Sequence, residues 1–265
     1  MSDRPVVIMT RPVEQAADLT SQLQQWGYAV QLLPALTIEP VVWSEQTRTR
    51  LQRLAQFDFV HFSSPNAIRY ALEPLYNKGL SWSGSVHIGL MGHGSQHMMR
   101  RYYPESEALW ITPPEQGPWD SESLIQVMAQ QSWLKNLHRA LLGKGQGGRE
   151  VLADWLRSRS VEVEYAEVYS RRTVEWTPQI EASLMSLARA ERCIWLLSSS
   201  EGTKALGKVL SKLSDAQLQH ELWHSVALVS HERVALAAQG AGFQQVIVCN
   251  PGEKGLKAAL ESLHD

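Results

Sequence analysis

Small hydroxyl residues, glycines and cations gather in short segments that follow apolar runs. Six segments share this character: Thr10-Arg11-Pro12, Ser63-Ser64-Pro65-Asn66, Gly92-His93-Gly94-Ser95, Lys144-Gly145-Gln146-Gly147, Ser198-Ser199-Ser200 and Ser230-His231-Glu232-Arg233. Hydroxyl groups, backbone N–H groups and cations suit a ligand with several carboxylates or phosphates. The segments have no paired acids, no Cys/His cluster and no G-x-S-x-G motif, which argues against glycosidase-like, metal-dependent and serine-hydrolase mechanisms.

One segment resembles a nucleotide-binding turn. Gly143, Gly145 and Gly148 match G-x-G-x-x-G between an expected strand and a helix expected from Arg149. No clean ribose-binding carboxylate closes a second strand, because Glu162 and Glu164 come too early and alternate with core residues. No Gly-Lys-Ser/Thr ending makes a P-loop. We therefore predict an anion site with Lys144 and Arg149 near a helix N-terminus. A dinucleotide site and a tight turn with solvated charges are the alternatives.

The elements that position these segments repeat along the chain. We expect strand–loop–helix units to start at Pro5, Phe57, Ser85, Ala140, Cys193 and Val226. Such repetition predicts an α/β fold of two similar, flavodoxin-like lobes with parallel sheets. Right-handed crossovers place each loop at the carboxyl edge of its sheet, where ligands of open α/β sheets bind.

The composition is that of an ordinary globular protein. Of 265 residues, 44% are hydrophobic and 20% charged, and the net charge of −2 does not favour a nucleic-acid partner. Cys193 and Cys249 lie in apolar runs and are expected to be buried thiols. No apolar run approaches the ~20 residues of a membrane span, and the N-terminus has no signal-peptide pattern. We therefore expect a cytoplasmic protein.

The ordered set of motifs is similar to that of the uroporphyrinogen-III synthase family. The matching stretches are IMTRP (8–12), FSSPNA (62–67), GHGS (92–95), DSESL (120–124), GKGQGGREVL (143–152), EVYSRR (167–172), SSSEG (198–202) and VSHERVA (229–235). They extend over nearly the whole chain. GKGQGGRE followed about twenty residues later by VYSRR is the most specific pair.

The resemblance implies a division that the repeat alone does not predict. From the repeat alone, two consecutive lobes would meet near residue 136. In the family the first unit joins the last two, so one lobe would comprise residues 1–36 and 173–265 and the other residues 37–172. The resemblance implies an active-site cleft between the lobes. Connectors at Ala35–Pro40 and Ser170–Trp176 would form a two-stranded hinge.

The resemblance also implies a reaction. The family cyclises hydroxymethylbilane, which has eight carboxylates, to uroporphyrinogen III in haem and tetrapyrrole biosynthesis, with loss of water and inversion of ring D. The implied activity is that of a carbon–oxygen lyase without metal or cofactor. Because cyclisation without enzyme gives the uninverted isomer, the protein would mainly hold geometry. The implied state is a monomer with a transient contact to hydroxymethylbilane synthase and no nucleic-acid or membrane partner.

Tyr169 is the catalytic residue that the resemblance implies, with its phenol assisting departure of the substrate hydroxyl. A tyrosine packed at the hinge is the structural alternative. The implied substrate-binding residues supply a hydroxyl, an amide, a cation or a glycine N–H: Thr10, Arg11, Ser63, Ser64, Asn66, Gly92, Ser95, Lys144, Gly145, Gly147, Arg149, Ser198, Ser199, Ser200, Ser230 and Arg233. Lys144 stands where arginine is common in the family, which keeps the charge but loses the bidentate fork.

Two other functions remain open from the sequence. A two-lobed α/β ligand-binding or regulatory domain without enzymatic activity would share the same cleft and loops. A nucleotide-dependent enzyme would use the loop that starts at Gly143. The roles of His93 and His231 also stay open.

Overall fold

The computed structural model describes residues 4–79, 86–115, 117–175, 177–178, 180–182, 184–185, 193–250 and 252–263. Ser85 and Trp176, which bound an expected strand unit and an expected connector, lie outside these ranges. The chain divides into two compact units. Unit 1 comprises residues 1–38 and 172–265, and unit 2 comprises residues 39–171.

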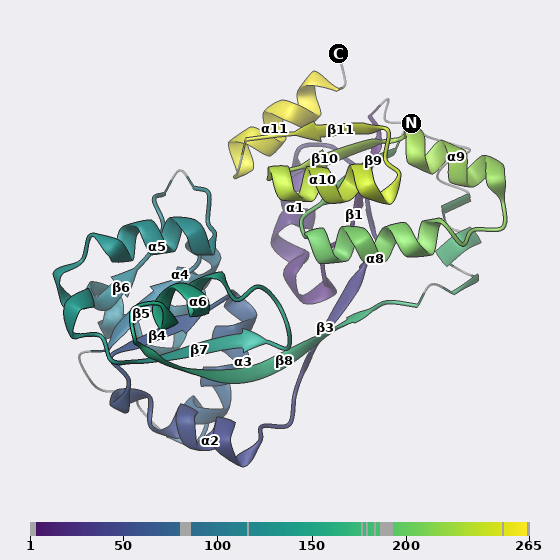
Figure 1. The fold of residues 1–265 in the computed structure, drawn as a ribbon. Coiled ribbons are helices and arrows are strands. Elements are labelled where there is room, and N and C mark those ends of the chain that lie inside the picture. Colours follow the sequence, from purple (N-terminus) through teal and green to yellow (C-terminus); the bar gives the residue numbers. More distant parts are fainter. Residues whose placement is uncertain are drawn as a thin grey trace. The chain divides into compact units, whose positions relative to one another are not determined.

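Unit 1 is built on a five-stranded sheet in the order β11-β10-β9-β1-β2 (Figure 1). Neighbouring strands are parallel. Parallel sheets covered on both faces require apolar strands, and β1 and β9 are buried at every position. The strands are β1 (Val6–Met9), β2 (Val30–Leu32), β9 (Cys193–Leu197), β10 (Val226–Val229) and β11 (Gln245–Val248).

Helices cover both faces of this sheet. One face packs Trp195 and Leu197 against α8, α9 and α10, and the other packs Met9 and Leu196 against α1 and α11. Cys193 and Cys249 are buried and neither is in a disulfide, which confirms the prediction of buried thiols. The helices are η1 (Val13–Gln15), α1 (Ala17–Gln25), α8 (Ser200–Leu210), α9 (Ala216–His224), α10 (Glu232–Ala241) and α11 (Glu253–Ser262).

Unit 2 contains a six-stranded sheet in the order β3-β8-β7-β4-β5-β6. The pairs β8–β7, β7–β4, β4–β5 and β5–β6 are parallel, so the predicted α/β fold with parallel sheets is confirmed. The expected connectors are largely strand, because β3 and the end of β8 extend through them. The strands are β3 (Leu36–Pro40), β4 (Phe59–Phe62), β5 (His87–Leu90), β6 (Trp110–Ile111), β7 (Arg139–Gly145) and β8 (Glu162–Thr173).

The helices of unit 2 also cover its sheet. α5 and α6 pack Leu124 and Leu152 against Phe59 on one face, while α3 and α4 pack against each other. Among the described residues of the chain, no helix is long and apolar enough to cross a bilayer. The helices are α2 (Glu45–Gln52), η2 (Leu54–Gln56), α3 (Pro65–Tyr76), α4 (His93–Tyr102), η3 (Pro104–Leu109), α5 (Ser121–Ala129), η4 (Ser132–Asn136) and α6 (Val151–Arg157).

His61 is a titratable side chain in the core of unit 2. The residue is 4% exposed, and its Nδ1 lies 3.0 Å from the carbonyl oxygen of Gly89 on β5. A Cβ at position 89 would lie 2.6 Å from the ring of Phe59 and 3.0 Å from His61 Nδ1, so glycine makes room for both rings. Burial lowers the pKa of His61 from 6.5 to about 4.

Acid should therefore destabilise unit 2 through His61. Between pH 6.5 and about 4, an unfolded imidazole binds a proton that the buried one does not. The free energy of unfolding should fall over this window as pH falls, by about 3 kcal/mol relative to a chain without the imidazole. Denaturant titrations of the wild type and His61→Gln across this range measure the difference. Parallel pH profiles for the two proteins would contradict this assignment.

Candidate functional site

Neighbouring strand ends in unit 2 bring several predicted site residues together. β8, β7, β4 and β5 lie side by side. Gly145, Ser63 and Gly92 lie at or just beyond the ends of β7, β4 and β5, and Tyr169 lies within β8. The register pairs Gly145 with Tyr169 after a shift in pairing at Lys144. The N–H of Ser63 donates to the carbonyl oxygen of residue 143 at 3.0 Å, which attaches the β4 loop to β7.

The phenol of Tyr169 is held in a defined place. Tyr169 is 4% exposed, and its hydroxyl oxygen lies 3.2 Å from Oγ of Ser64. The ring of Tyr70 and the guanidinium of Arg171 lie 6.1 and 5.8 Å from its ring. Ser64 Oγ also accepts the N–H of Ala67 at 3.1 Å, as the N-cap of α3. One serine therefore fixes both the start of a helix and the position of the phenol.

The predicted glycine loop is partly strand. β7 continues through Gly145, so Gly143 and Gly145 are not turn residues. A Cβ at Gly145 would lie 2.5 Å from the ring of Tyr169, and one at Gly143 would lie 2.6 Å from an aromatic ring of β4. Gly147 and Gly148 make the turn, with φ of 70° and 97°, and α6 starts two residues later than predicted. Gly143 and Gly145 are therefore glycines because aromatic rings lie against them. The G-x-G-x-x-G spacing no longer supports a dinucleotide site.

The two cations predicted to bind an anion are paired with carboxylates of the chain itself. Lys144 Nζ lies 2.5 Å from Oε1 of Glu150. Arg149 makes a two-point contact with Glu122, in which Nη2 lies 3.1 Å from Oε2. The hydrogen bond that Lys144 donates to Glu150 holds the pKa of the Glu150 carboxyl below its ordinary value. Both Lys144 and Arg149 therefore have a carboxylate partner within the chain.

The loop after β5 is covered by an indole. A Cβ at Gly92 would lie 2.8 Å from the ring of Trp119, whose centroid lies 5.0 Å from the edge-on ring of His93. Ser95 is fully buried, and its hydroxyl donates to the carbonyl oxygen of Met91 at 3.3 Å. Ser95 is therefore closed to a ligand in this structure, and Trp119 lies over Gly92.

In unit 1, Thr10 and Arg11 follow β1. Thr10 is 8% exposed, and its hydroxyl donates to the carbonyl oxygen of Leu196 at 3.1 Å, so it joins β1 to β9. Arg11 is partly buried, and burial lowers the pKa of its guanidinium. Within the described part of the chain, its side chain has neither an ion-pair nor a hydrogen-bond partner. Arg11 thus differs from Lys144 and Arg149, because no described residue supplies a carboxylate partner for its guanidinium.

The other unit 1 loops meet at the ends of β9 and β10. The register pairs Leu197 with Val229, so Ser198 and Ser230 follow neighbouring strand ends. Ser199 caps α8 by accepting the N–H of residue 202 at 3.3 Å. The Ser200 hydroxyl donates to the carbonyl oxygen of residue 233 at 3.2 Å, so the two loops are in contact.

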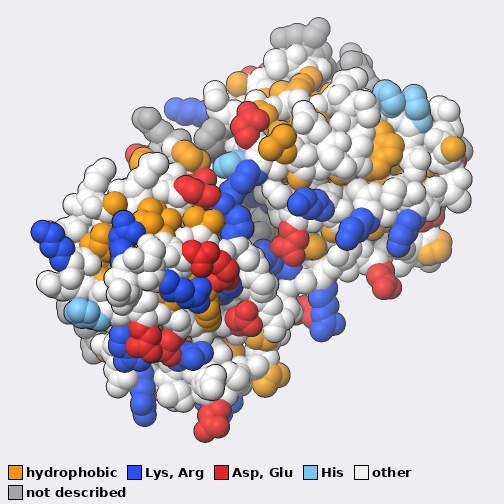
Figure 2. Space-filling model, viewed as in Figure 1, with side chains coloured by type: hydrophobic (Ala, Val, Ile, Leu, Met, Phe, Trp, Pro, Cys, Tyr) orange, Lys and Arg blue, Asp and Glu red, His pale blue; other side chains and the backbone are white. Residues whose placement is uncertain are grey.

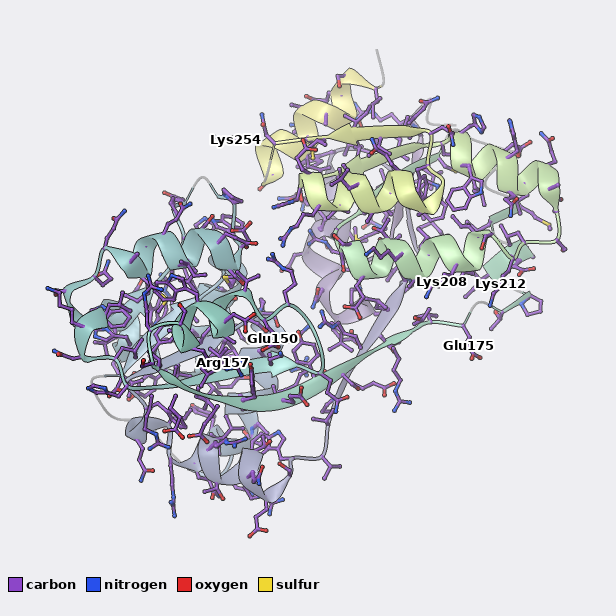
Figure 3. All side chains as sticks on the ribbon, viewed as in Figure 1. Glu150, Arg157, Glu175, Lys208, Lys212 and Lys254 are labelled. Atoms are coloured by element: carbon purple, nitrogen blue, oxygen red, sulfur yellow. The ribbon has the colours of Figure 1, made fainter. Side chains whose placement is uncertain are left out.

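Basic side chains lie along α8 and just past its end (Figure 2). Lys204 and Lys208 share one face of α8 at a four-residue spacing, Lys212 lies two residues beyond the end of the helix, and all three are exposed. Figure 3 labels Lys208 near the end of α8 and Lys212 beyond it. Because α8 starts at the Ser198 loop, these lysines lead away from the carboxyl edge of the unit 1 sheet.

A cavity of about 710 Å³ in unit 2 lies away from these loops. Its lining includes Leu54, Leu75, Tyr76 and Tyr103. These residues come from the C-terminal ends of α3 and α4 and from the segment before β4, at the amino edge of the sheet. The cavity is therefore separate from the candidate site.

Comparison with known protein families decides the family. The family model described as uroporphyrinogen-III synthase HemD matches residues 17–257. The chain belongs to the uroporphyrinogen-III synthase family. The resemblance inferred from the ordered motifs is thereby confirmed, and the non-enzymatic binding module is not favoured.

Two named uroporphyrinogen-III synthases are similar to this chain over 65% or more of its length. The protein of Escherichia coli strain K12 is 26% identical over 258 residues, covering 96% of this chain and 99% of its own. That of Proteus mirabilis is 28% identical over 173 residues, covering 65% of this chain and 83% of its own. The similarity to these synthases is thus distributed along the chain.

Solved structures of uroporphyrinogen-III synthases share the fold. A mutant synthase from Thermus thermophilus aligns with a TM-score of 0.58 at 15% identity, covering 98% of each chain. The synthase of Helicobacter pylori 26695 also gives 0.58, at 14% identity, covering 98% of this chain and 99% of its own. At this identity the likeness establishes the fold alone.

Sequence reasoning missed three residues that shape the loops of this family member. Glu150 and Glu122 pair with the expected cations, and Trp119 covers Gly92. Glu150 had a detectable signal, since it lies six residues from Lys144 across a turn rich in glycine. Glu122 and Trp119 had none, because their contacts depend on how separate loops pack.

Gly145→Ala tests the contact that positions Tyr169. The added methyl would overlap the phenol ring, so we expect a loss of about 1–3 kcal/mol in the free energy of unfolding. The hydrogen bond between Tyr169 and Ser64 should also be lost, as a crystal structure of the variant would show. Gly240→Ala is the control, because open space surrounds Gly240 in α10. Equal stability of the wild type and Gly145→Ala would refute the packing argument.

Proposed function

We propose that this chain is a uroporphyrinogen-III synthase of tetrapyrrole biosynthesis, a carbon–oxygen lyase that cyclises hydroxymethylbilane to uroporphyrinogen III. The observation that carries the proposal is the family match over residues 17–257. The reaction expels one water from the substrate and inverts ring D. Ordinary acid–base side chains suffice for it, provided that they hold the flexible substrate in one geometry.

The loops support a substrate with many carboxylates. Arg11 has a lowered pKa and no carboxylate partner among the described residues, so a ligand carboxylate would relieve the cost of its burial. The exposed lysines Lys204 and Lys208 on α8 and Lys212 just beyond it would attract an anion with eight charges. Hydroxyls at Ser63, Ser198 and Ser230 would add neutral donors.

Tyr169 is the proposed proton donor. Its phenol would protonate the hydroxyl of the substrate as the carbon–oxygen bond breaks, so that water leaves and an azafulvenium-like cation remains. Ring D would then attack the carbon of this cation to form a spiro intermediate, and the rearranged product would lose a proton to the phenolate. The hydrogen bond between Tyr169 and Ser64, at 3.2 Å, supports this role because it fixes the direction of the hydroxyl.

The proposal assigns substrate-binding loops to both parts of the expected division, residues 1–36 with 173–265 and residues 37–172. Thr10 and Ser95 would act in it by holding their loops, since the hydroxyl of each donates to a backbone carbonyl. Lys144 and Arg149 would bind substrate carboxylates after exchange with Glu150 and Glu122.

Isomer analysis tests the proposed function. Freshly made hydroxymethylbilane is incubated with the protein, and the products are oxidised and separated into type I and type III. We expect mostly type III, in proportion to the protein added. Formation of the type I isomer alone, at the spontaneous rate, would contradict the proposed activity and favour a ligand-binding domain without enzymatic activity.

Tyr169→Phe tests the proton donor. The variant keeps the ring that packs on Gly145 but loses the hydroxyl, so kcat should fall at least about tenfold while product affinity changes little. Tyr76→Phe is the matched control, because it removes an exposed phenol at the other end of α3. An unchanged kcat for Tyr169→Phe would remove this phenol from the mechanism.

A further inference from the structure

A four-residue network surrounds the Lys144 side chain. Lys144 Nζ lies 2.5 Å from Glu150 Oε1 and 4.8 Å from the centroid of the Tyr165 ring. The Tyr165 hydroxyl donates to the other oxygen of Glu150, and Arg157 Nη2 donates to the same hydroxyl at 2.7 Å. Glu150 and Arg157, labelled in Figure 3, come from the start and the end of α6. The carboxylate of Glu150 thus lies between two cations.

Glu150 has a second partner within reach. Arg157 Nη1 lies 3.9 Å from Glu150 Oε2, farther than Lys144 lies from Oε1. A small movement of the carboxylate toward Arg157 would keep it paired while it leaves Lys144. The side chains of Glu150 and Arg157 are 40% and 47% exposed, so the exchange requires little desolvation.

Lys144 has contacts other than its ion pair with Glu150. Its side chain is 13% exposed and lies over the Tyr165 ring, which attracts a cation. Within the described part of the chain, Glu150 is the one carboxylate paired with Lys144. Departure of Glu150 would therefore leave a positioned cation beside the end of β7.

We propose that Glu150 is a positioning residue that occupies Lys144 in the free protein and yields it to a ligand carboxylate by moving to Arg157. Before the exchange Glu150 pairs with both Lys144 and Arg157, and after it Lys144 pairs with the ligand while Glu150 keeps Arg157. Glu150 is thus an internal competitor that weakens binding of a polycarboxylate. This inference rests on the proposed function for the identity of the ligand, but its test can be read without turnover.

Binding of uroporphyrin III, a stable octacarboxylate, is the direct readout. Tryptophan fluorescence quenching at fixed ionic strength gives Kd for each variant. Glu150→Gln should lower Kd at least about threefold, since a neutral amide competes less well for Lys144. Arg157→Gln should raise Kd about twofold or more, because Glu150 then loses its second partner. If Glu150 had a purely structural role, Kd would not change in opposite directions for Glu150→Gln and Arg157→Gln.

Two controls separate this exchange from general charge effects. Glu107→Gln removes the same charge from an exposed pair with Arg100 in unit 2, and its Kd should match the wild type. In a Lys144→Gln background, Glu150→Gln should no longer lower Kd. Hydroxymethylbilane kinetics add a second readout, in which Glu150→Gln should lower KM with kcat nearly unchanged.

An unchanged or raised Kd for folded Glu150→Gln would overturn the proposal. If Glu150→Gln fails to fold, an unchanged or lowered Kd for Arg157→Gln would overturn it equally. Failure of the proposed function is a distinct result, because type III product would then be absent although Kd shifts as expected. Type III product with no shift in Kd would reject only the role of Glu150.

Discussion

In unit 2 the ring of Tyr169 lies against the Cα of Gly145, and this contact determines where the phenol points. The pairing of β7 with β8 shifts at Lys144, which brings Gly145 opposite Tyr169. A side chain at position 145 would fill the space that the ring occupies. The hydroxyl then reaches Ser64, which is itself fixed as the N-cap of α3. Strand pairing, helix capping and the proposed proton donor are therefore parts of one arrangement.

Parallel pairing extends the same principle to both units. In each sheet the parallel strands end at one edge, so loops far apart in sequence lie beside each other. Serine caps α3 in unit 2 and α8 in unit 1, so the same device starts a helix at both edges. The charges differ, however. Lys144 and Arg149 are satisfied by carboxylates within unit 2, whereas Arg11 in unit 1 has no carboxylate partner among the described residues.

The sequence predicted the repeating strand–loop–helix units because buried parallel strands are apolar and several of the helices after them, such as α3, α4 and α8, start at serine or glycine. It did not predict that Gly143 and Gly145 belong to a strand, since glycines before a helix ordinarily indicate a turn. It also did not predict the burial of Ser95 or the cover that Trp119 forms over Gly92. Both depend on contacts between separate loops, which local spacing does not encode.

A double-mutant cycle between Ser64 and Tyr169 tests the central claim that this pair orients the reacting phenol. The rate of type III formation is measured for the wild type, Ser64→Ala, Tyr169→Phe and the double variant, under conditions in which all four are folded. The account predicts that Ser64→Ala slows the wild type but has little further effect once the phenol is gone, with a coupling energy of about 1 kcal/mol. Independent, additive losses would mean that the hydrogen bond between the two hydroxyls does not orient the phenol for the reaction.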